Sequence, residues 1–253
     1  MRQTGFSEDQ IETLCRLTAP LALAVKCASL TRIAATLVET YLGRDAGQRV
    51  LDGRIARGVA DRIGAVIWFS DLRDFTRITD TTVPEQVIPL LNDYAEAVSS
   101  AIHDAGGEVL KLIGDGILAI FTADAAGHAC RCALDAETRA RERVSTLSER
   151  RGSQGLPITS LYLSLHIGDV FYGNIGSSDR LDFTVVGPAV NEASRIAGLC
   201  RSIGRDLLIS SAFAAAAFKE DRSRLISVGC HALRGVAQPQ ELFTLRLDER
   251  MPR

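Results

Sequence analysis

An uninterrupted apolar segment constrains the fold of this 253-residue chain more than any other feature. Residues 65–69 read Ala-Val-Ile-Trp-Phe, and Asp71 follows closely. Because no polar residue alternates with the apolar ones, the pattern predicts a strand that is buried on both faces. Short strands are expected at 108–112 and 117–121 around Gly114-Asp115-Gly116, which is a hairpin turn signal. We expect these strands to lie side by side.

Helical and extended segments are mixed along the rest of the main domain. Apolar residues at helical spacing predict helices over 84–104, where Pro89 is awkward, and over 125–150. A third helix is expected over 188–200, with Pro188 in its first turn. Further strands are expected at 161–167, 170–175, 207–210, 225–233 and 241–245, and Gly168-Asp169 is expected to join the first two tightly. This order predicts an α+β or α/β sandwich.

The first 60 residues are interpreted as a helical N-terminal extension, and 61–253 as the main domain. Residues 7–43 are predicted to be helical, with Ser7 as the N-cap and Gln10 as its capping-box partner. Pro20 is expected to break or kink this helix, and Gly43 to close it. Residues 44–60 are predicted to be a connector with about one helical turn. The extension is either a packing element or a transducing helix that sets how two main domains face each other.

Composition argues against several classes of protein. A net charge of −2 without a basic stripe is not typical of a nucleic-acid binder. No stretch reaches the roughly 18 uninterrupted apolar residues of a membrane span. Acidic residues precede the short apolar run 17–25, which is the wrong flank for a secretory signal. Six scattered cysteines favour a reduced, cytoplasmic location, and Cys130 and Cys132 are interpreted as helix thiols rather than zinc ligands. The chain can still be the end of a longer protein.

Two aspartates and a downstream amide–cation pair are the candidate chemical groups. Asp71 and Asp115 each follow an apolar strand, so neighbouring strands would let both carboxylates hold Mg²⁺ ions. Either residue alone is more simply a turn residue. Asn191 and Arg195 are four residues apart and share a helix face. Carboxylates for metal and an arginine for developing phosphate charge are typical of phosphoryl or nucleotidyl transfer.

Four ordered motifs resemble the catalytic domain of the class III nucleotidyl cyclases, which are the adenylyl and guanylyl cyclases. The resemblance covers roughly residues 62–245. The motifs are 69–76 (Phe-Ser-Asp-Leu-x-x-Phe-Thr), Gly114-Asp115-Gly116, 173–176 (Gly-Asn-Ile-Gly) and 190–196 (Val-Asn-Glu-Ala-Ser-Arg-Ile). The resemblance implies a ferredoxin-like sandwich derived from βαββαβ, with a central, mostly antiparallel sheet and helices packed on it.

The resemblance also implies a reaction, in which the ribose 3′-hydroxyl of a triphosphate attacks its own α-phosphate and pyrophosphate leaves. Asp71 and Asp115 match the residues that bind two Mg²⁺ or Mn²⁺ ions, and the Leu72 carbonyl is a further ligand. Asn191 matches the residue that orients the ribose, and Arg195 the residue that stabilises charge on the reacting phosphate.

Phosphate contacts and base selection follow from the same resemblance. Phe75 and Thr76 match the turn whose backbone holds the terminal phosphates, and Arg234 is a further candidate. Lys111 and Thr184 match the base-reading positions. An ammonium donates to adenine N1 and a hydroxyl accepts from the N6 amine, so this pair favours ATP. The implied partner is a second copy of the chain, because the family assembles metal and base-reading residues across a head-to-tail homodimer.

Two positions depart from the family pattern. Asp74 stands where the family usually has glycine, so its side chain either repels the triphosphate, changes the turn, or points to solvent and pairs with Arg73. Asp169 stands where some members carry a phosphate-binding arginine. The leading hypothesis is an adenylate cyclase. The alternatives are a guanylate or relaxed-specificity cyclase, or a degenerate nucleotide-binding regulatory domain.

Overall fold

The computed structural model describes residues 5–236 and 238–246. The chain divides into two compact units, Met1–Arg54 and Ile55–Arg253. The first unit contains two helices, α1 (Glu8–Leu42) and α2 (Arg44–Leu51).

The boundaries of α1 follow its capping residues. The Ser7 hydroxyl accepts a hydrogen bond from the Gln10 N–H, and the Gln10 side chain bonds back to the Ser7 N–H, so the predicted capping box is confirmed. Gly43 caps the C-terminal end with a φ of 86°. The prediction of a break at Pro20 is wrong, because α1 continues through it. The connector also holds more helix than expected, since α2 spans eight residues.

Helix α1 exposes apolar side chains on two different sides. None of its residues is buried within the described chain. At about 3.6 residues per turn, most apolar residues of the first half lie along one side: Ile11, Leu14, Leu17, Leu21 and Val25. Those of the second half lie along the opposite side, together with Leu23 of the first half: Leu30, Ile33, Leu37 and Tyr41. By length and composition α1 is long and apolar enough to cross a membrane. Core helices and signal sequences meet the same criterion, so the expected absence of a span stays a prediction.

The second unit alternates strands and helices. Its strands are β1 (Ala60–Leu72), β2 (Glu108–Ile113), β3 (Gly116–Phe121), β4 (Leu161–Gly176), β5 (Leu181–Val186), β6 (Leu207–Ser210), β7 (Leu225–His231) and β8 (Gln240–Leu245). Its helices are α3 (Phe75–Thr81), α4 (Pro84–Asp104), α5 (Ala126–Ser153), α6 (Pro188–Ala197), α7 (Cys200–Ile203), α8 (Ser211–Ala216) and α9 (Lys219–Arg222).

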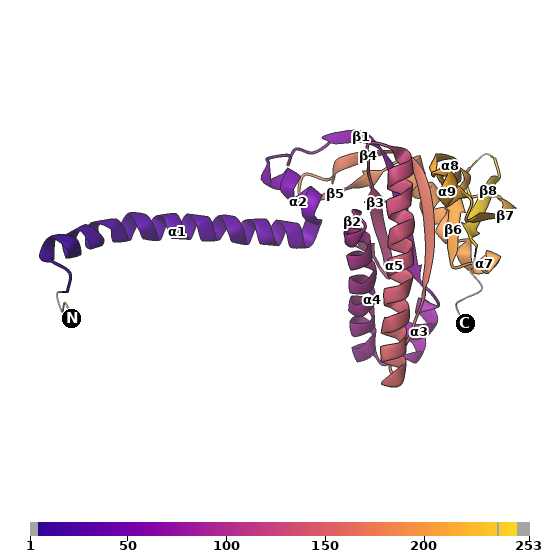
Figure 1. Cartoon of the computed structure of the whole chain (residues 1–253), viewed down its shortest axis with the longest axis horizontal. Coiled ribbons are helices and arrows are strands. Elements are labelled where there is room, and N and C mark those ends of the chain that lie inside the picture. The colour runs from indigo at the N-terminus through magenta and orange to yellow at the C-terminus, as the bar shows by residue number, and fades with distance from the viewer. Residues whose placement is uncertain (1–4, 237, 247–253) are drawn as a thin grey trace. The chain divides into compact units, whose positions relative to one another are not determined.

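One mostly antiparallel sheet organises this unit. The strand order is β2-β3-β1-β4-β6-β8-β7, with β5 paired to β4, and β4–β6 is a parallel pair. The long helices α4 and α5 run side by side against the sheet (Figure 1), and their apolar residues join Trp68 and Phe121 in the main core. Ile196 and Cys200 pack with Leu208 in a second core cluster. The predicted α+β sandwich is therefore confirmed.

The predicted hairpin at Gly168-Asp169 is wrong. β4 is one continuous strand, which pairs with β1 from Leu161 to Gly173, and it turns back only into β5, which the sequence pattern missed. Gly168 pairs with Ala65 of β1 inside this strand, so it makes no tight turn. A Cβ there would lie 2.8 Å from the Ala189 side chain, so the glycine lets α6 approach the sheet closely.

Candidate active site

Two strands bring Asp71 and Asp115 to the same end of the sheet. Asp71 is the penultimate residue of β1, and the pairing of β1 with β3 runs up to Ser70. The β2–β3 hairpin that carries Asp115 therefore begins beside Asp71. Gly114 has a φ of 65°, and a Cβ at Gly116 would lie 3.1 Å from the Ser70 carbonyl oxygen. Glycine on both sides of Asp115 allows this close approach.

The two carboxyl groups interact directly. Burial, followed by a hydrogen bond with Asp115 and the charge of Asp115, raises the pKa of Asp71 from 3.8 to about 7. The Leu72 N–H donates to Asp71 Oδ1 at 3.0 Å and opposes this rise. Close carboxylates repel unless a proton or a cation neutralises them.

This oxygen donor set fits a hard divalent cation such as Mg²⁺ or Mn²⁺. No cluster of three or more His, Cys, Asp or Glu side chains suited to a metal occurs among the described residues. An ion bound at Asp71 and Asp115 would therefore have to take its remaining ligands from main-chain carbonyls, water or substrate.

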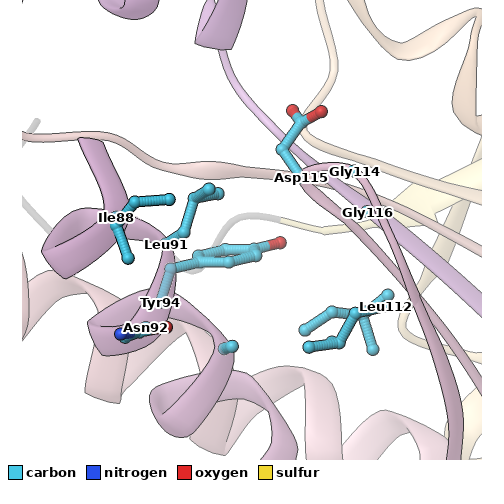
Figure 2. A pocket seen from close by; sticks show the side chains of 10 residues that line it. Ile88, Leu91, Asn92, Tyr94, Leu112, Gly114, Asp115 and Gly116 are labelled. Carbon is cyan, nitrogen blue, oxygen red and sulfur yellow. The ribbon is translucent and has the colours of Figure 1, made fainter. Parts of the chain in front are cut away.

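A buried hydrogen-bond network supports the end of β1. The Ser70 hydroxyl accepts from Trp68 Nε1 at 3.0 Å and from the Tyr94 hydroxyl at 3.4 Å, and all three residues are buried. Burial raises the pKa of Tyr94 above its usual range, so its hydroxyl stays neutral. Figure 2 shows Tyr94 of α4 below the hairpin, in a groove of about 170 Å³, whereas the carboxylate of Asp115 points away from α4. Sequence patterns identified neither Ser70 nor Tyr94 as a supporting residue.

The turn after β1 contains a residue with an unusual backbone conformation. Asp74 has a φ of 55°, and among the described residues no other non-glycine residue has a positive φ. Glycine adopts this region without strain. Its carboxylate lies 3.8 Å from Arg77 and 3.5 Å from Arg201 of α7. The suggested pairing of Asp74 with Arg73 is wrong, because Arg73 pairs with Asp206 at 3.4 Å. Phe75 and Thr76, the other residues expected here, begin α3.

The structure brings Lys111 of β2 to strand β5, which carries Thr184. Lys111 Nζ lies 2.6 Å from Asp182 Oδ2. Asp182 and Thr184 are two residues apart in β5, so their side chains point to the same face. Sequence reasoning missed Asp182, although its spacing from Thr184 placed it on that face.

Asn191 and Arg195 lie one turn apart on α6. Asn191 is exposed and Arg195 is partly buried. The Arg195 guanidinium packs against Gly235, where a Cβ would lie 3.4 Å from a guanidinium nitrogen. Arg234, next to this contact, is exposed.

Buried and partly buried polar contacts hold α6 on the sheet. Ser164 donates to the Ala193 carbonyl at 2.7 Å, and Gln240 donates to Glu192 at 2.8 Å. His166 lies 3.8 Å from Glu192 and 2.9 Å from the Ser210 hydroxyl. These contacts fix the helix that carries Asn191 and Arg195. Asp169, at the other position that departs from the family, pairs with Arg62 at 2.5 Å.

The expected site residues therefore form three groups. Asp71, Leu72 and Asp115 lie at the end of β1 and β3, Lys111 and Thr184 lie at β2 and β5, and Asn191 and Arg195 lie on α6.

Comparison with known proteins places this arrangement in a family. The model of the adenylate and guanylate cyclase catalytic domain matches residues 60–245. An adenylate cyclase of Anabaena cylindrica is 36% identical over 157 residues, which are 60% of this chain and 30% of that protein. Adenylate cyclase 1 of Rhizobium meliloti is 33% identical over 152 residues, 58% of this chain and 22% of that protein. The chain thus spans less than a third of the length of these two relatives.

Solved structures agree on the fold. A bacterial light-regulated adenylyl cyclase superposes with a TM-score of 0.76 at 23% identity, over 90% of this chain and 65% of that one. The guanylyl cyclase Cya2 superposes with a TM-score of 0.64 at 27% identity, over 76% of this chain and 96% of that one. Since the family model covers most of the chain, the protein belongs to the adenylate and guanylate cyclase catalytic domain family.

Proposed function

We propose that this protein is an adenylate cyclase, which converts ATP into 3′,5′-cyclic AMP and pyrophosphate. The observation that carries the proposal is the interacting carboxylate pair Asp71–Asp115 within a domain of the cyclase family. In the reaction the ribose 3′-oxygen bonds to the α-phosphorus. The bond from that phosphorus to the oxygen shared with the β-phosphate breaks, and the hydroxyl proton is released.

Asp71, Asp115 and the Leu72 carbonyl would hold two divalent cations, Mg²⁺ or Mn²⁺, which when bound polarise phosphate and hydroxyl oxygens. The chain's own residues orient the nucleotide and neutralise its charge. Asn191 hydrogen-bonds the ribose, and Arg195 stabilises the charge that develops on the α-phosphate. The packing of Arg195 against Gly235 limits its rotamers, which lowers the entropy cost of this contact.

The terminal phosphates are held by the turn that follows β1. The backbone N–H groups of Phe75 and Thr76 are the proposed donors, and the exposed Arg234 supplies a further cation. Asp74 lies in the same turn, but Arg77 and Arg201 partly neutralise its carboxylate. A triphosphate therefore meets less repulsion there than the sequence suggests.

The proposed base is adenine. Lys111 donates to adenine N1 and the Thr184 hydroxyl accepts from the N6 amine. Two relatives named adenylate cyclase support ATP, whereas the structural likeness to Cya2 keeps guanylate or relaxed-specificity cyclase activity as the alternative. Lys111→Glu separates the two, because it replaces the donor to adenine with an acceptor and should depress ATP use far more than GTP use.

We further propose that the working enzyme is a head-to-tail homodimer with two composite sites. Asp71 and Asp115 of one protomer would face Lys111, Thr184 and the α6 residues of its partner. A symmetric pair satisfies both sites with one interface. The α1 helix fits a transducing role in such a dimer, because each half exposes an apolar side that a neighbouring helix can cover.

An assay of the purified protein tests the proposal. ATP and GTP are supplied separately with Mg²⁺ or Mn²⁺, and products are identified by mass spectrometry. Cyclic AMP from wild type and from the exposed control Asp80→Ala, but not from Asp71→Ala, is the expected result. Tight binding of an ATP analogue without any cyclic product under Mn²⁺ would instead identify a degenerate regulatory domain.

A further inference from the structure

The last residues before β4 bind the main chain at the end of β1. Arg73, which follows β1, donates its N–H to the Ser160 carbonyl at 2.8 Å. The Thr159 hydroxyl lies 3.1 Å from the Arg73 carbonyl oxygen and equally far from the Ser160 carbonyl oxygen, so its single proton is shared between them. Both main-chain polar groups of Arg73 are therefore bound by residues 159–160.

The bond from the Arg73 N–H sets the direction of the Leu72 carbonyl. The two groups belong to one planar trans peptide and point in opposite directions. Since Ser160 accepts the N–H on the β4 side of β1, the Leu72 carbonyl points to the β3 side. The Ser70 carbonyl, two residues earlier, faces the same side, because a Cβ at Gly116 would lie 3.1 Å from its oxygen. The Leu72 oxygen is thus directed toward the β2–β3 hairpin.

Two hydrogen bonds, one on each peptide of Arg73, oppose rotation of this residue. The Ser160 carbonyl holds the peptide before it, and the Thr159 hydroxyl holds the peptide after it. With the first bond alone, Arg73 could pivot about that bond, and the Leu72 carbonyl would turn with the same peptide. The hydroxyl opposes this motion, so less freedom is lost when a cation binds the carbonyl.

The segment before β4 is itself anchored to the two long helices. The Ser148 hydroxyl of α5 donates to the Thr159 carbonyl at 2.8 Å. The Pro157 carbonyl accepts from Arg151 Nε at 2.9 Å, and Arg151 Nη1 lies 2.6 Å from Asp93 of α4. The Arg151 side chain is 4% exposed, so its bonds are shielded from water. These contacts connect the packed helices α4 and α5 to the end of β1.

We propose that Thr159 is a positioning residue, whose hydroxyl keeps the Leu72 carbonyl directed at the divalent cations of the site. The inference rests on the proposed function, since it concerns a ligand of the same cations. Thr159 does not bind the cations itself and acts through Arg73. Its hydroxyl is therefore expected to change cation affinity more than stability.

The test measures Mn²⁺ binding in the absence of nucleotide. The dissociation constant of Mn²⁺ is determined by calorimetry for wild type and for Thr159→Val, which keeps the shape of the side chain and removes the hydroxyl. Thr159→Ser keeps the hydroxyl, and Ser148→Ala releases the Thr159 carbonyl. Thr146→Val is the matched control, because it removes a threonine hydroxyl that also donates to a carbonyl, at 3.0 Å, but within α5. Tm and cyclisation of ATP and GTP are measured on the same proteins.

We expect Thr159→Val to raise the Mn²⁺ dissociation constant about fivefold, as the loss of one neutral hydrogen bond predicts. Ser148→Ala should raise it about twofold by the same route. Thr159→Ser and Thr146→Val should leave it unchanged.

A purely structural role would give a different result. Thr159→Val would then lower the Tm and leave the Mn²⁺ dissociation constant unchanged, which would overturn the inference. Equal weakening in Thr159→Ser and Thr159→Val would overturn it too, because the hydroxyl would not be the group that acts. If Thr159→Val does not fold, Ser148→Ala decides, and an unchanged constant in that variant counts against the positioning role.

The same proteins separate this inference from the proposed function. Mn²⁺ binding that depends on the Thr159 hydroxyl, without cyclic product from ATP or GTP, would refute the cyclase proposal and support the positioning role. Cyclic AMP formation with an Mn²⁺ affinity that is independent of Thr159 would do the reverse. Absence of both Mn²⁺ binding and cyclic product would overturn both.

Discussion

Removing one charge from the Asp71–Asp115 pair should stabilise the metal-free protein. The pKa of Asp71 is raised from 3.8 to about 7 in the folded state. Since the folded state binds the proton more tightly than the unfolded state, stability falls as pH rises from about 4 to about 7 and stays reduced above that. Asp71→Asn keeps the shape of the side chain and removes this cost.

The magnitude follows from the size of the pKa change. A change from 3.8 to about 7 corresponds to at most about 4 kcal/mol, at about 1.36 kcal/mol for each tenfold change in proton affinity. Asp71 is only partly buried, so solvent screening reduces this to about 1–2 kcal/mol. For a domain of this size that is a rise in Tm of about 3–6 °C for Asp71→Asn at pH 8.

Thermal unfolding in a chelating buffer measures the effect. The difference in Tm between Asp71→Asn and wild type should shrink by more than half at pH 5, where wild type is largely protonated at this site. Adding Mn²⁺ at pH 8 should raise the Tm of wild type and not that of the variant. The exposed control Asp80→Asn should match wild type throughout. A metal-free Asp71→Asn protein that is no more stable than wild type at pH 8 would refute the claim that burial and the neighbouring Asp115 make an ionised Asp71 unfavourable.

Three further predictions concern the composite site, the turn after β1 and the packing of α6 on the sheet. Mixing Asp71→Ala with Arg195→Ala protein, each inactive alone, should restore about a quarter of wild-type activity through heterodimers with one intact site; no recovery would count against shared sites. Asp74→Asn should lower the KM for ATP several-fold by removing charge, and Asp74→Gly should also raise the Tm, because φ is 55° there; an unchanged KM in both would show that the carboxylate does not face the triphosphate. Gly168→Ala should cost about 1–3 kcal/mol and reduce activity, since its Cβ would lie 2.8 Å from an α6 side chain, whereas Gly152→Ala in α5, with 3.8 Å of room, should not.

Features that depend on neighbouring residues were predicted from the sequence better than features that depend on distant ones. The α4 helix was predicted at its observed bounds, and the Ser7 capping box formed as expected, because helical periodicity and capping depend on residues a few positions apart. Gly168 shows the limit of such reasoning. The Gly168-Asp169 pair suggested a turn, but the role of Gly168 depends on how closely α6 approaches β4.

Local sequence patterns predicted the buried strands, the long helices and the motifs that mark Asp71, Asp115, Asn191 and Arg195, because polarity and turn residues follow short-range rules. The electrostatic partners of these motifs became visible only in the folded chain. The Lys111 ammonium reaches Asp182 across 71 residues, because the fold brings β2 and β5 close together. Which charged side chains form an ion pair depends on their distance and burial in the folded chain, and not on how close they are in the sequence.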